Sequence, residues 1–281
     1  MKAGERVKTD RRDARKLARC LRAGDLTPVY VPEEATEALR DLERAREAAK
    51  KAEIAAKHQL GKFLLRQGRR FTEGSNWTQK HLASIRRQTF EHEAHRRVLR
   101  DSLKAVEDAV ERVARLTADI EELVVEAAQA PLIVALQALR GFQVVSATVV
   151  AAELGDLRRF EAAGPSMAFV GLVPSEHTTG PHTRRGSITR TGNRRVRRIL
   201  VEAAWHYRHP PGMSRALRQR NAKVSEPVRQ IAWKAQKRLY RKFRRMVYER
   251  GKSPQLAVAA MARELMGFVW AIGQEKQLLA E

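Results

Sequence analysis

Apolar residues recur every three or four positions through the centre of the chain, and this spacing constrains the fold more than any other feature of the sequence. Charged residues fill the other faces, a pattern typical of the a/d seam of a coiled coil. The pattern predicts two long helices, at 33–70 and 76–129, separated by a glycine-containing break, GRRFTEGSN. They form either an antiparallel hairpin that packs on itself or an intermolecular coiled coil that assembles an oligomer. The seam comprises Leu99, Leu103, Val106, Val110, Val113, Leu116, Ile120 and Leu123.

The segment before these helices, residues 1–32, is short and basic. Its first part, KTDRRDARKLARCLRAG, is predicted to be a helix with Gly24 as its C-cap, and Pro28 and Pro32 prevent its continuation. The VYV that follows suits a three-residue strand, which needs a sheet to pair with, and the sequence supplies no other obvious strand. We therefore expect this segment to be the end of a larger domain.

Residues 131–281 have a different texture, and the chain as a whole is predicted to be mainly α. A helix, a turn at Gly141, an apolar helix and a second glycine turn come first. Across 164–193, Gly, Pro, Ser and Thr cluster too densely for a regular element, so we expect a long loop there. Helices then resume, and the last begins with Ser253 as N-cap and Pro254 at the first helical position.

The positive charge of the chain is too large for an ordinary compact domain. Its 281 residues include 55 lysines and arginines against 32 acidic residues, a formal net charge of +23. Such self-repulsion usually persists because a polyanion offsets it, and DNA, RNA and an anionic membrane are the candidates. Between Arg184 and Arg250 the sequence has 21 lysines and arginines and three acidic residues. The C-terminal half is therefore the predicted polyanion-binding surface.

Nothing in the composition favours a membrane. There is no run of about 18 apolar residues, the N-terminal residues lack the apolar core of a secretory signal, and no basic helix pairs with a strongly lipophilic face. The single cysteine, Cys20, cannot form an internal disulfide or a cysteine-rich zinc site. We expect a protein of a reducing cytoplasm with no membrane partner.

Basic residues suited to phosphate contacts lie in the 164–193 loop and on the helices after it. Arginine-rich helices with apolar backs fit a nucleic-acid backbone, and the aromatic residues among them are either core or stacking surfaces for bases. Gly141 suggests a helix-hairpin-helix, whose free amides bind phosphate; a plain turn between core helices explains it equally well. The candidates are Gly141, Arg184, Arg185, Arg190, Arg194, Arg195, Arg197, Arg198, Lys237, Arg238, Arg241 and Arg244.

Two groups of residues could take part in chemistry. Asp10 and Asp13 share a helix face, where two carboxylates can hold Mg²⁺ together with substrate phosphates, although D-x-x-D is more often an ordinary solvated face. The 164–193 loop sets hydroxyls beside arginines, which suits phosphoryl transfer through a hydroxyl nucleophile. A phosphate-clamping loop without covalent chemistry is the alternative. His177 and His182 are poor zinc candidates, since no cysteines or dense carboxylates accompany them.

The same segments, in this order, resemble the IS-one-ten insertion-sequence transposases, which are DEDD, bridge-RNA-guided recombinases. KTDRRDARKLARCLRAGDLTPVYVP resembles the end of their RuvC-like nuclease domain, an RNase-H-like α/β fold, and the long helices resemble their coiled-coil linker. AELGDLRRF, FVGLVPSEHTTG and RRGSITRTGNRRVRRILVEAAWHYR resemble the signature of their C-terminal transposase domain. The resemblance implies three parts: 1–32 from the nuclease domain, 33–130 as linker, and 131–281 as the DNA-binding, nucleophile-bearing domain.

The resemblance also implies a mechanism that residue types alone do not. In this family four acidic residues bind Mg²⁺, a serine of the second domain attacks DNA, and a structured RNA chooses target and donor within a homo-oligomer, a dimer or tetramer. Asp10 and Asp13 match the last two acidic residues, and Thr179, just before Gly180, matches the nucleophile. The family therefore implies DNA transposition, with DNA and a guide RNA as partners.

Two departures from the family pattern concern activity. The strands that would carry the other two acidic residues have no counterpart, so we expect an N-terminally truncated or altered copy, explained by a miscalled start codon, a frameshift or a degraded element. Threonine replaces serine at position 179 and adds a methyl group that stiffens χ1. We expect this polypeptide alone to be inactive or very weak, and the alternative function is a catalytically inactive nucleic-acid-binding remnant.

Overall fold

The computed structural model describes residues 9–26, 29–179 and 182–275, and the chain divides into two compact units, Met1–Glu33 and Glu34–Glu281. The first unit contains the helix α1, Asp10–Ala23, with the Thr9 side chain at its N-cap and Gly24, φ 72°, at its C-cap. This confirms the predicted helix and its glycine stop. No side chain of α1 is buried within the unit. Val29, Tyr30 and Val31 form no regular strand and are exposed.

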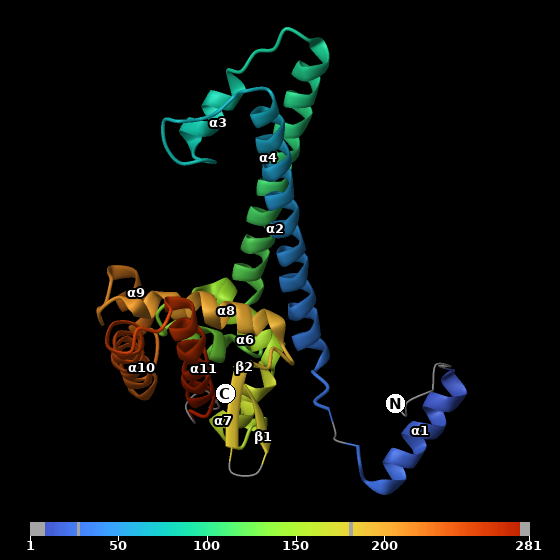
Figure 1. Ribbon diagram of the computed structural model, residues 1–281, viewed down its shortest axis with the longest axis vertical. Helices are drawn as coiled ribbons and strands as arrows, with labels where there is room; N and C mark the ends of the chain where they lie inside the picture. The colour runs from blue at the N-terminus through green and yellow to red at the C-terminus, as the bar shows by residue number, and fades with distance from the viewer. Residues whose placement is uncertain (1–8, 27–28, 180–181, 276–281) are drawn as a thin grey trace. The chain divides into compact units, whose positions relative to one another are not determined.

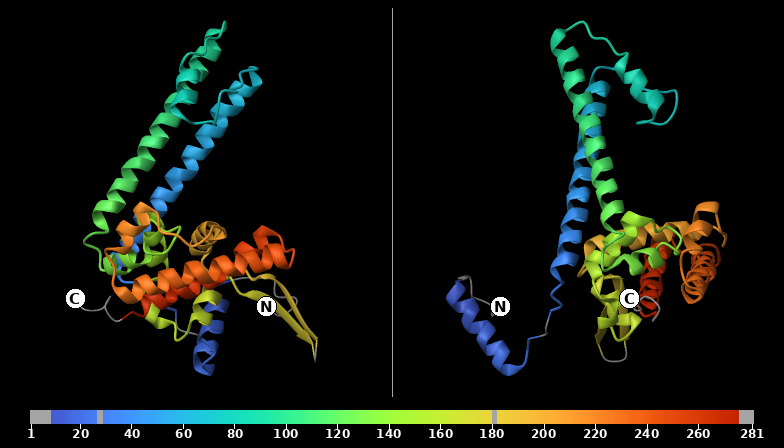
Figure 2. Two further views of the ribbon diagram at one scale, coloured as in Figure 1. Left: turned by 90° about the vertical axis from the view of Figure 1, so that its left-hand side faces the viewer. Right: turned by 180° about the vertical axis from the view of Figure 1, so that it is seen from behind.

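The two longest helices of the second unit, α2 (Glu34–Arg66) and α4 (Glu93–Leu123), lie side by side (Figures 1 and 2). Of the two arrangements that the seam allowed, the chain adopts the hairpin that packs on itself. The buried members of the seam are spaced seven residues apart, whereas Val110 and Leu123 are exposed. Four seam residues face α2: Leu99, Val106, Val113 and Ile120.

The second long helix is shorter than the sequence pattern indicated. It begins at Glu93 rather than at residue 76 and ends at Leu123 rather than at 129. Residues 76–92 instead contain the separate helix α3, Gln79–Arg86, whose N-cap is Thr78. The chain folds back here because Phe90 and Ile85 pack onto Phe63 at the end of α2, and this burial outweighs continuation of a solvated helix.

The remainder of the second unit is a helical domain. Its α-helices are α5 (Ala130–Leu136), α6 (Val144–Leu154), α7 (Ala163–Phe169), α8 (Arg194–Ala204), α9 (Arg215–Asn221), α10 (Glu226–Arg244) and α11 (Pro254–Gly273). Short 3₁₀ helices at Leu157–Arg159 and Trp205–Arg208 and a π-helical segment at Arg245–Glu249 connect or extend them. The predicted start of α11 is confirmed, because the Ser253 hydroxyl accepts a hydrogen bond from the Leu256 amide.

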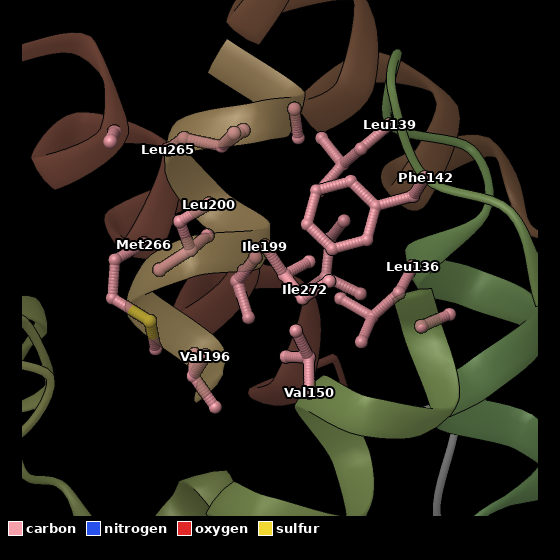
Figure 3. Close-up of a cluster of buried hydrophobic side chains, with 14 of the residues drawn as sticks. Leu136, Leu139, Phe142, Val150, Val196, Ile199, Leu200, Leu265, Met266 and Ile272 are labelled. Carbon is pink, nitrogen blue, oxygen red and sulfur yellow. The ribbon is translucent and has the colours of Figure 1, made fainter. Parts of the chain in front are cut away.

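The core of this domain lies where α5, α6, α8 and α11 meet (Figure 3). Phe142, from the turn between α5 and α6, packs with Leu200 of α8 and Ile272 of α11, and all three are fully buried. At about 25 cal/mol per Å² of apolar surface, such side chains supply most of the folding free energy of a domain this size. The four helices are therefore a fixed frame for whatever the domain presents at its surface.

One helix of the domain has the length and hydropathy of a membrane span, although Arg263 and Glu264 interrupt its apolar sequence. It is α11, with 20 residues and a mean hydropathy of 1.5. Its apolar face, including Met261, Leu265 and Val269, is buried against α7, α8 and α10. Burial in the core accounts for the hydropathy, and Glu264 interrupts the run with an ion-paired carboxylate.

The segment expected to be a long irregular loop contains regular structure. Besides α7, it forms two antiparallel strands, β1 (Pro174–Thr179) and β2 (His182–Ile188), with a bulge between Pro174 and Glu176. We call this β-hairpin the arm; Figure 2 shows its strands projecting away from the helices. The expectation failed because both faces of these strands are polar, so they lack the apolar alternation that marks a half-buried strand.

Candidate nucleic-acid interface

Thr179 stands at the end of β1, at the tip of the arm. In the register, Thr178 lies opposite Thr183 and Thr179 opposite His182. Successive residues of a strand point to opposite faces, so the two threonine hydroxyls face different sides. Both threonines are exposed to solvent, and the Thr178 hydroxyl donates to Glu176 (Oγ1 to Oε1, 2.7 Å). Of the two neighbouring hydroxyls, that of Thr179 is the better placed to meet a ligand.

The other candidate residues in and beside the arm differ in exposure and in backbone conformation. Arg184 on β2 is exposed, and so is Arg190, which follows the arm with a left-handed backbone, φ 57°. Arg190 is one of few non-glycine residues in this strained region, which costs on the order of 1 kcal/mol. The side chains of Arg185, His177 and His182 lie outside the described part of the structure.

Two glycines lock the base of the arm against α8. Gly171 and Gly192 have φ of 65° and 69°, and a Cβ at either would overlap the backbone of the other turn, at Thr191 and Phe169 respectively. Arg197 of α8 joins the same two turns, because its Nη1 donates to the Val170 oxygen (2.8 Å) and to the Thr191 oxygen (2.9 Å). Arg197, a predicted phosphate ligand, therefore has a clear role in holding the arm.

The start of α8 is fixed by a carboxylate that sequence reasoning missed. The Oδ1 of Asn193, the N-cap, accepts from the amides of Arg195 and Val196 at 3.0 Å, and its Nδ2 donates to Oε2 of Glu153 (2.8 Å). Arg44 of α2 donates to Oε1 of Glu153 at 3.0 Å. Glu153 is the only acid in the apolar helix VVSATVVAAEL. A single acidic residue in such a helix is the sequence feature that could have identified it as a buried ion-pair partner.

Electrostatics keep Glu153 ionised despite its burial. Burial alone would raise its pKa, but hydrogen bonds from Arg44 and Asn193 and the charges of Arg44 and Arg195 outweigh it, and the pKa lies below its ordinary value. The carboxylate thus binds α2, α6 and α8 together. It also orients Asn193, which immediately follows the arm.

The arginines of α8 divide into engaged and exposed groups. Arg195 donates to Glu47 of α2 (Nε to Oε2, 2.6 Å), and Arg198 lies 3.5 Å from the same carboxylate and 3.7 Å from Glu202. Arg194 is exposed. Since protein carboxylates already neutralise Arg195 and Arg198, Arg194 is the member of this group best placed for a phosphate.

Gly141 has a packing role in the structure. Its φ is 86°, and a Cβ would come within 2.9 Å of the Ala203 backbone on α8. The preceding Arg140 donates to carbonyl oxygens of the 206–212 segment, among them Gly212 (2.8 Å). The start of α6 is closed by a capping box, in which the Gln143 amide donates to Ser146 Oγ (2.8 Å). These contacts favour the plain turn between core helices, because the turn's polar groups serve the fold.

Helix α10 presents a basic face. Lys237, Arg241 and Arg244 are exposed, while Arg238 pairs with Glu264 of α11 at 2.9 Å. The face borders a hollow of about 740 Å³, which Tyr240 also lines, and Trp233 earlier on the same helix is 39% exposed. Of the aromatics noted in the sequence, Tyr207 and Phe243 are buried in the core. The face therefore combines exposed cations with exposed aromatic rings, since Lys237 lies over Trp233 and Arg244 over Tyr248, and its cations suit backbone contacts.

A second hollow, of about 810 Å³, lies between α2, α6 and α8. Arg46, Arg140 and Arg220 line it together with Glu43, whose side chain is buried and whose Oε2 has no hydrogen-bond partner among the described residues. Burial, with the charges of Glu47 and Glu153, raises the pKa of Glu43 to about 7. Glu43 is therefore a carboxyl group that is half protonated near neutrality and lies in a hollow lined by arginines. The sequence did not indicate this arrangement.

Asp10 and Asp13 lie in the first turn of α1, in the other compact unit. Their spacing places both carboxylates on one helix face, as predicted. Within 9–26, 29–179 and 182–275, no group of three or more His, Cys, Asp or Glu side chains could hold a metal ion. Two carboxylate donors fit the protein's share of a Mg²⁺ site that waters and substrate phosphates complete.

Two families of transposases match parts of this chain. Residues 134–218 match the Transposase IS116/IS110/IS902 family, and residues 1–67 match the DEDD transposase domain of the IS110 type. The transposase-named protein y4qE of Sinorhizobium fredii is 44% identical over 274 residues, which are 98% of this chain and 67% of y4qE.

A second relative is the transposase for insertion sequence element IS1533 of Leptospira borgpetersenii. It is 27% identical over 252 residues, which are 88% of this chain and 72% of that protein. The chain belongs to the IS116/IS110/IS902 family of insertion-sequence transposases.

Proposed function

We propose that this protein carries out DNA transposition by cleaving and rejoining DNA through the hydroxyl of Thr179. The observation that carries the proposal is the position of Thr179, exposed at the end of β1 on an arm that Gly171, Gly192 and Arg197 fix to α8. A rigid base and an exposed tip suit a nucleophile that must reach a phosphorus inside a bound duplex.

In the proposed reaction the Thr179 oxygen attacks a DNA phosphorus, a phosphate–threonine bond forms, and the bond to the leaving sugar oxygen breaks. The hydroxyl proton passes to a base or water, and the leaving oxygen takes one up. Attack by the hydroxyl of a second strand then restores Thr179 and joins the DNA. Exposed arginines, Arg184 and Arg190, would stabilise the charge on the phosphorus. The threonine methyl group slows the attack relative to serine.

Asp10 and Asp13 would hold Mg²⁺ as part of a RuvC-like metal site in residues 1–32. When bound, the ion supplies positive charge that stabilises the developing oxyanion. The carboxylates bind and position it, and Lys8, Arg11 and Arg12 of the same sequence segment would attract the DNA backbone to this unit. Residues 33–130 serve as the linker and 131–281 as the DNA-binding domain.

The DNA contacts are proposed for the exposed cations, above all Arg184, Arg190, Arg194, Lys237, Arg241 and Arg244. Arg185, Arg195, Arg198 and Arg238 contribute to the positive field, and Gly141 allows α8 to approach the turn before α6. A structured guide RNA would select the DNA. The exposed apolar residues Val110 and Leu123 would support a dimer or tetramer through a coiled coil. Because the proposed substrate is DNA, we expect the proposed activity to take place in the bacterial cytoplasm.

A strand-joining assay tests this proposal. The full chain, its guide RNA, labelled element-end DNA and Mg²⁺ are incubated, and covalent protein–DNA adducts and joined products are measured. We expect Thr179→Ala to abolish both, Thr179→Ser to increase them, and the matched control Thr178→Ala to retain them. Asp10→Asn with Asp13→Asn should abolish products while leaving DNA affinity within about twofold, because affinity depends mainly on phosphate contacts elsewhere.

The second candidate is nucleic-acid binding without catalysis. It is favoured by the limited metal site, since within the described residues two carboxylates have no third ligand beside them. If the wild-type chain binds DNA and gives neither adduct nor product, and Thr179→Ser does not restore them, this second function replaces the first.

A further inference from the structure

A pocket of about 540 Å³ lies at the tip of the helical hairpin, where the end of α2, the 67–78 loop and the start of α3 meet. We call it the tip pocket. Its floor is largely apolar and is formed by Phe71, Trp77 and His81, with Leu65 exposed beside them. Neither the transposition chemistry nor the C-terminal basic helices use these residues. Pockets of about 300–1,000 Å³ bury ligands of drug size, so this one has room for a flat aromatic group.

The aromatic side chains of the tip pocket hold one another in place. His81 lies between the other two rings, with centroids 4.7 Å from Phe71 and 5.3 Å from Trp77, the latter edge to face at 72°. The Trp77 amide donates to Nδ1 of His81 (2.8 Å), which requires a neutral, accepting imidazole. Burial lowers the His81 pKa and so favours that form. The pocket is therefore organised before any ligand arrives.

Trp77 has a strained backbone. Its φ is 64°, a left-handed conformation that costs a bulky residue on the order of 1 kcal/mol or more. The strain turns the indole toward the end of α2, where Lys57 Nζ lies 5.6 Å from its centroid and Gly61 leaves room for it. Trp77 packs against the apolar cluster of the hairpin tip and is half-buried, and the accessible part of its side chain lines the tip pocket. Strain that keeps a large aromatic ring partly exposed points to a binding surface.

The rim of the tip pocket is positively charged. Its titratable side chains are all basic, and no carboxylate lines it in the part of the chain that the structure describes: Lys57, His58, Lys62, Arg69 and Arg70. Lys57 pairs with Glu53 at 2.6 Å, and Arg69 donates to the Thr89 oxygen. Lys62 and Arg70 are exposed. They are free to meet an anion that accompanies a flat apolar group.

We propose that the tip pocket binds one unpaired base of a single-stranded nucleic acid, with the base against Trp77 and Phe71 and its phosphate on Lys62 and Arg70. The flat, apolar aromatic floor complements the face of a base, and the cationic rim complements the phosphate. A paired base cannot enter, because its faces are covered by its neighbours in the duplex. RNA and DNA share this chemistry, so both are possible sources of the base.

The tip pocket is a separate site from the arm. Eighteen residues of α2 separate Lys62 from Arg44, the residue that binds Glu153 beside α8. At 1.5 Å per residue this distance is about 27 Å along the helix. The inference goes beyond the proposed recombination and does not depend on Thr179, since it requires only that a single strand reach the hairpin tip.

Photocross-linking gives a local readout that the basic C-terminal helices do not obscure. The full chain is irradiated with 20-nucleotide single strands, one DNA and one RNA, that carry 5-iodouracil, and with the matching duplex. Cross-linked residues are mapped by mass spectrometry. We expect adducts at Trp77 or Phe71 with a single strand, and about tenfold fewer with the duplex. The stronger of the DNA and RNA signals identifies the source.

Two variants test the assigned contacts. Lys62→Glu with Arg70→Glu should reduce the tip adducts about tenfold, whereas Arg66→Glu with Arg100→Glu, the same charge change at exposed residues outside the pocket, should retain them. Trp77→Gly removes the ring but accepts the left-handed backbone, so it should fold and lose the adducts at Phe71. Circular dichroism checks the fold of each variant.

Three results would overturn the proposal. The first is the absence of adducts at the tip while other residues cross-link, and the second is equal labelling by duplex and single strand. The third is an unchanged tip signal in the Lys62→Glu, Arg70→Glu variant. Thr179→Ala should leave the tip adducts intact, so failure of the recombination proposal and failure of this one are distinguishable.

Discussion

Glu153 shows how single residues allow a strongly basic domain to pack. Its carboxylate accepts from Arg44 and Asn193, and Arg195 lies 3.7 Å away. With Glu47 it neutralises cations of α2 and α8 that would otherwise repel each other across the packed surface. A buried pair of this kind contributes little net stability relative to apolar packing, but removing one partner leaves the others buried and uncompensated.

Substitution of Glu153 should therefore be costly. We expect Glu153→Ala to lower the free energy of unfolding by about 3 kcal/mol, since Arg44 and Asn193 lose their acceptor. Glu153→Gln keeps an acceptor and should cost less. The control is Glu202→Gln, an exposed partner of Arg198, which should change stability by less than about 0.5 kcal/mol. Urea unfolding followed by circular dichroism measures all three, and equal losses at 153 and 202 would refute this assignment.

The raised pKa of Glu43 should make the free energy of unfolding depend on pH near neutrality. Its pKa in the folded protein is raised from 4.5 to about 7 by burial and by Glu47 and Glu153, so the folded state holds this proton more tightly than the unfolded state. Its contribution to stability therefore declines as pH rises from about 4.5 to 7. Glu43→Gln cannot ionise, and its stability relative to wild type should rise by on the order of 2 kcal/mol between pH 5 and pH 8.

Urea unfolding at the two pH values checks this expectation. Glu121→Gln, at an exposed carboxyl of α4, is the matched control and should show no such trend. A difference between Glu43→Gln and wild type that stays constant from pH 5 to pH 8 would mean that Glu43 does not titrate in this range.

At the scale of elements, the sequence predicted what local patterns determine. Spacing and capping gave α1 with its Gly24 stop, the hairpin helices and the start of α11. The predicted start of the second long helix was wrong because Phe90 packs on Phe63, a contact between residues 27 positions apart, which no local pattern contains. The arm was missed because its strands are stabilised by pairing with each other and by turns packed against α8, not by an apolar face.

The sequence also predicted the candidate site only in part. The basic stripes of α8 and α10 were evident, but their division into engaged and exposed arginines was not, since Glu47 lies 148 residues before its partner Arg195. Thr179 was singled out by family resemblance, because several hydroxyls of the same segment were chemically equivalent. The structure adds the strand geometry that separates Thr179 from Thr178.

The packing of α4 against α2 predicts different stability losses for two valines of the same helix. Val106 is 2% exposed and Val110, one turn further along the same helix, is 43% exposed. Val106→Ala should lower the free energy of unfolding by about 2 kcal/mol, from lost apolar burial and the remaining cavity, whereas Val110→Ala should change it by less than about 0.5 kcal/mol. Thermal unfolding at low protein concentration measures both. Similar losses for the two variants would mean that Val110 is also buried, as in a coiled coil between copies.

At the scale of the whole molecule, the net charge of +23 is distributed unequally between paired and exposed cations. On the hairpin many cations pair with acids of the same helix, as Lys104 does with Asp108 at 2.7 Å. On α10, Lys237, Arg241 and Arg244 face solvent. Cations that already have carboxylate partners release fewer counterions when they approach DNA, so the exposed face of α10 should dominate the binding of duplex DNA.

The salt dependence of DNA binding tests this distribution. The logarithm of the association constant falls linearly with the logarithm of the salt concentration, with a slope of about 0.9 per phosphate neutralised. Replacing Lys237, Arg241 and Arg244 together by alanine should therefore reduce the slope by about 2 to 3. The matched control replaces Lys80, Arg97 and Lys104, three exposed but ion-paired cations of the hairpin, and removes the same charge. Fluorescence anisotropy with a 20-base-pair duplex from about 50 to 200 mM salt gives both slopes. If both triple variants reduce the slope equally, binding follows net charge alone, and α10 is not the face that meets the DNA.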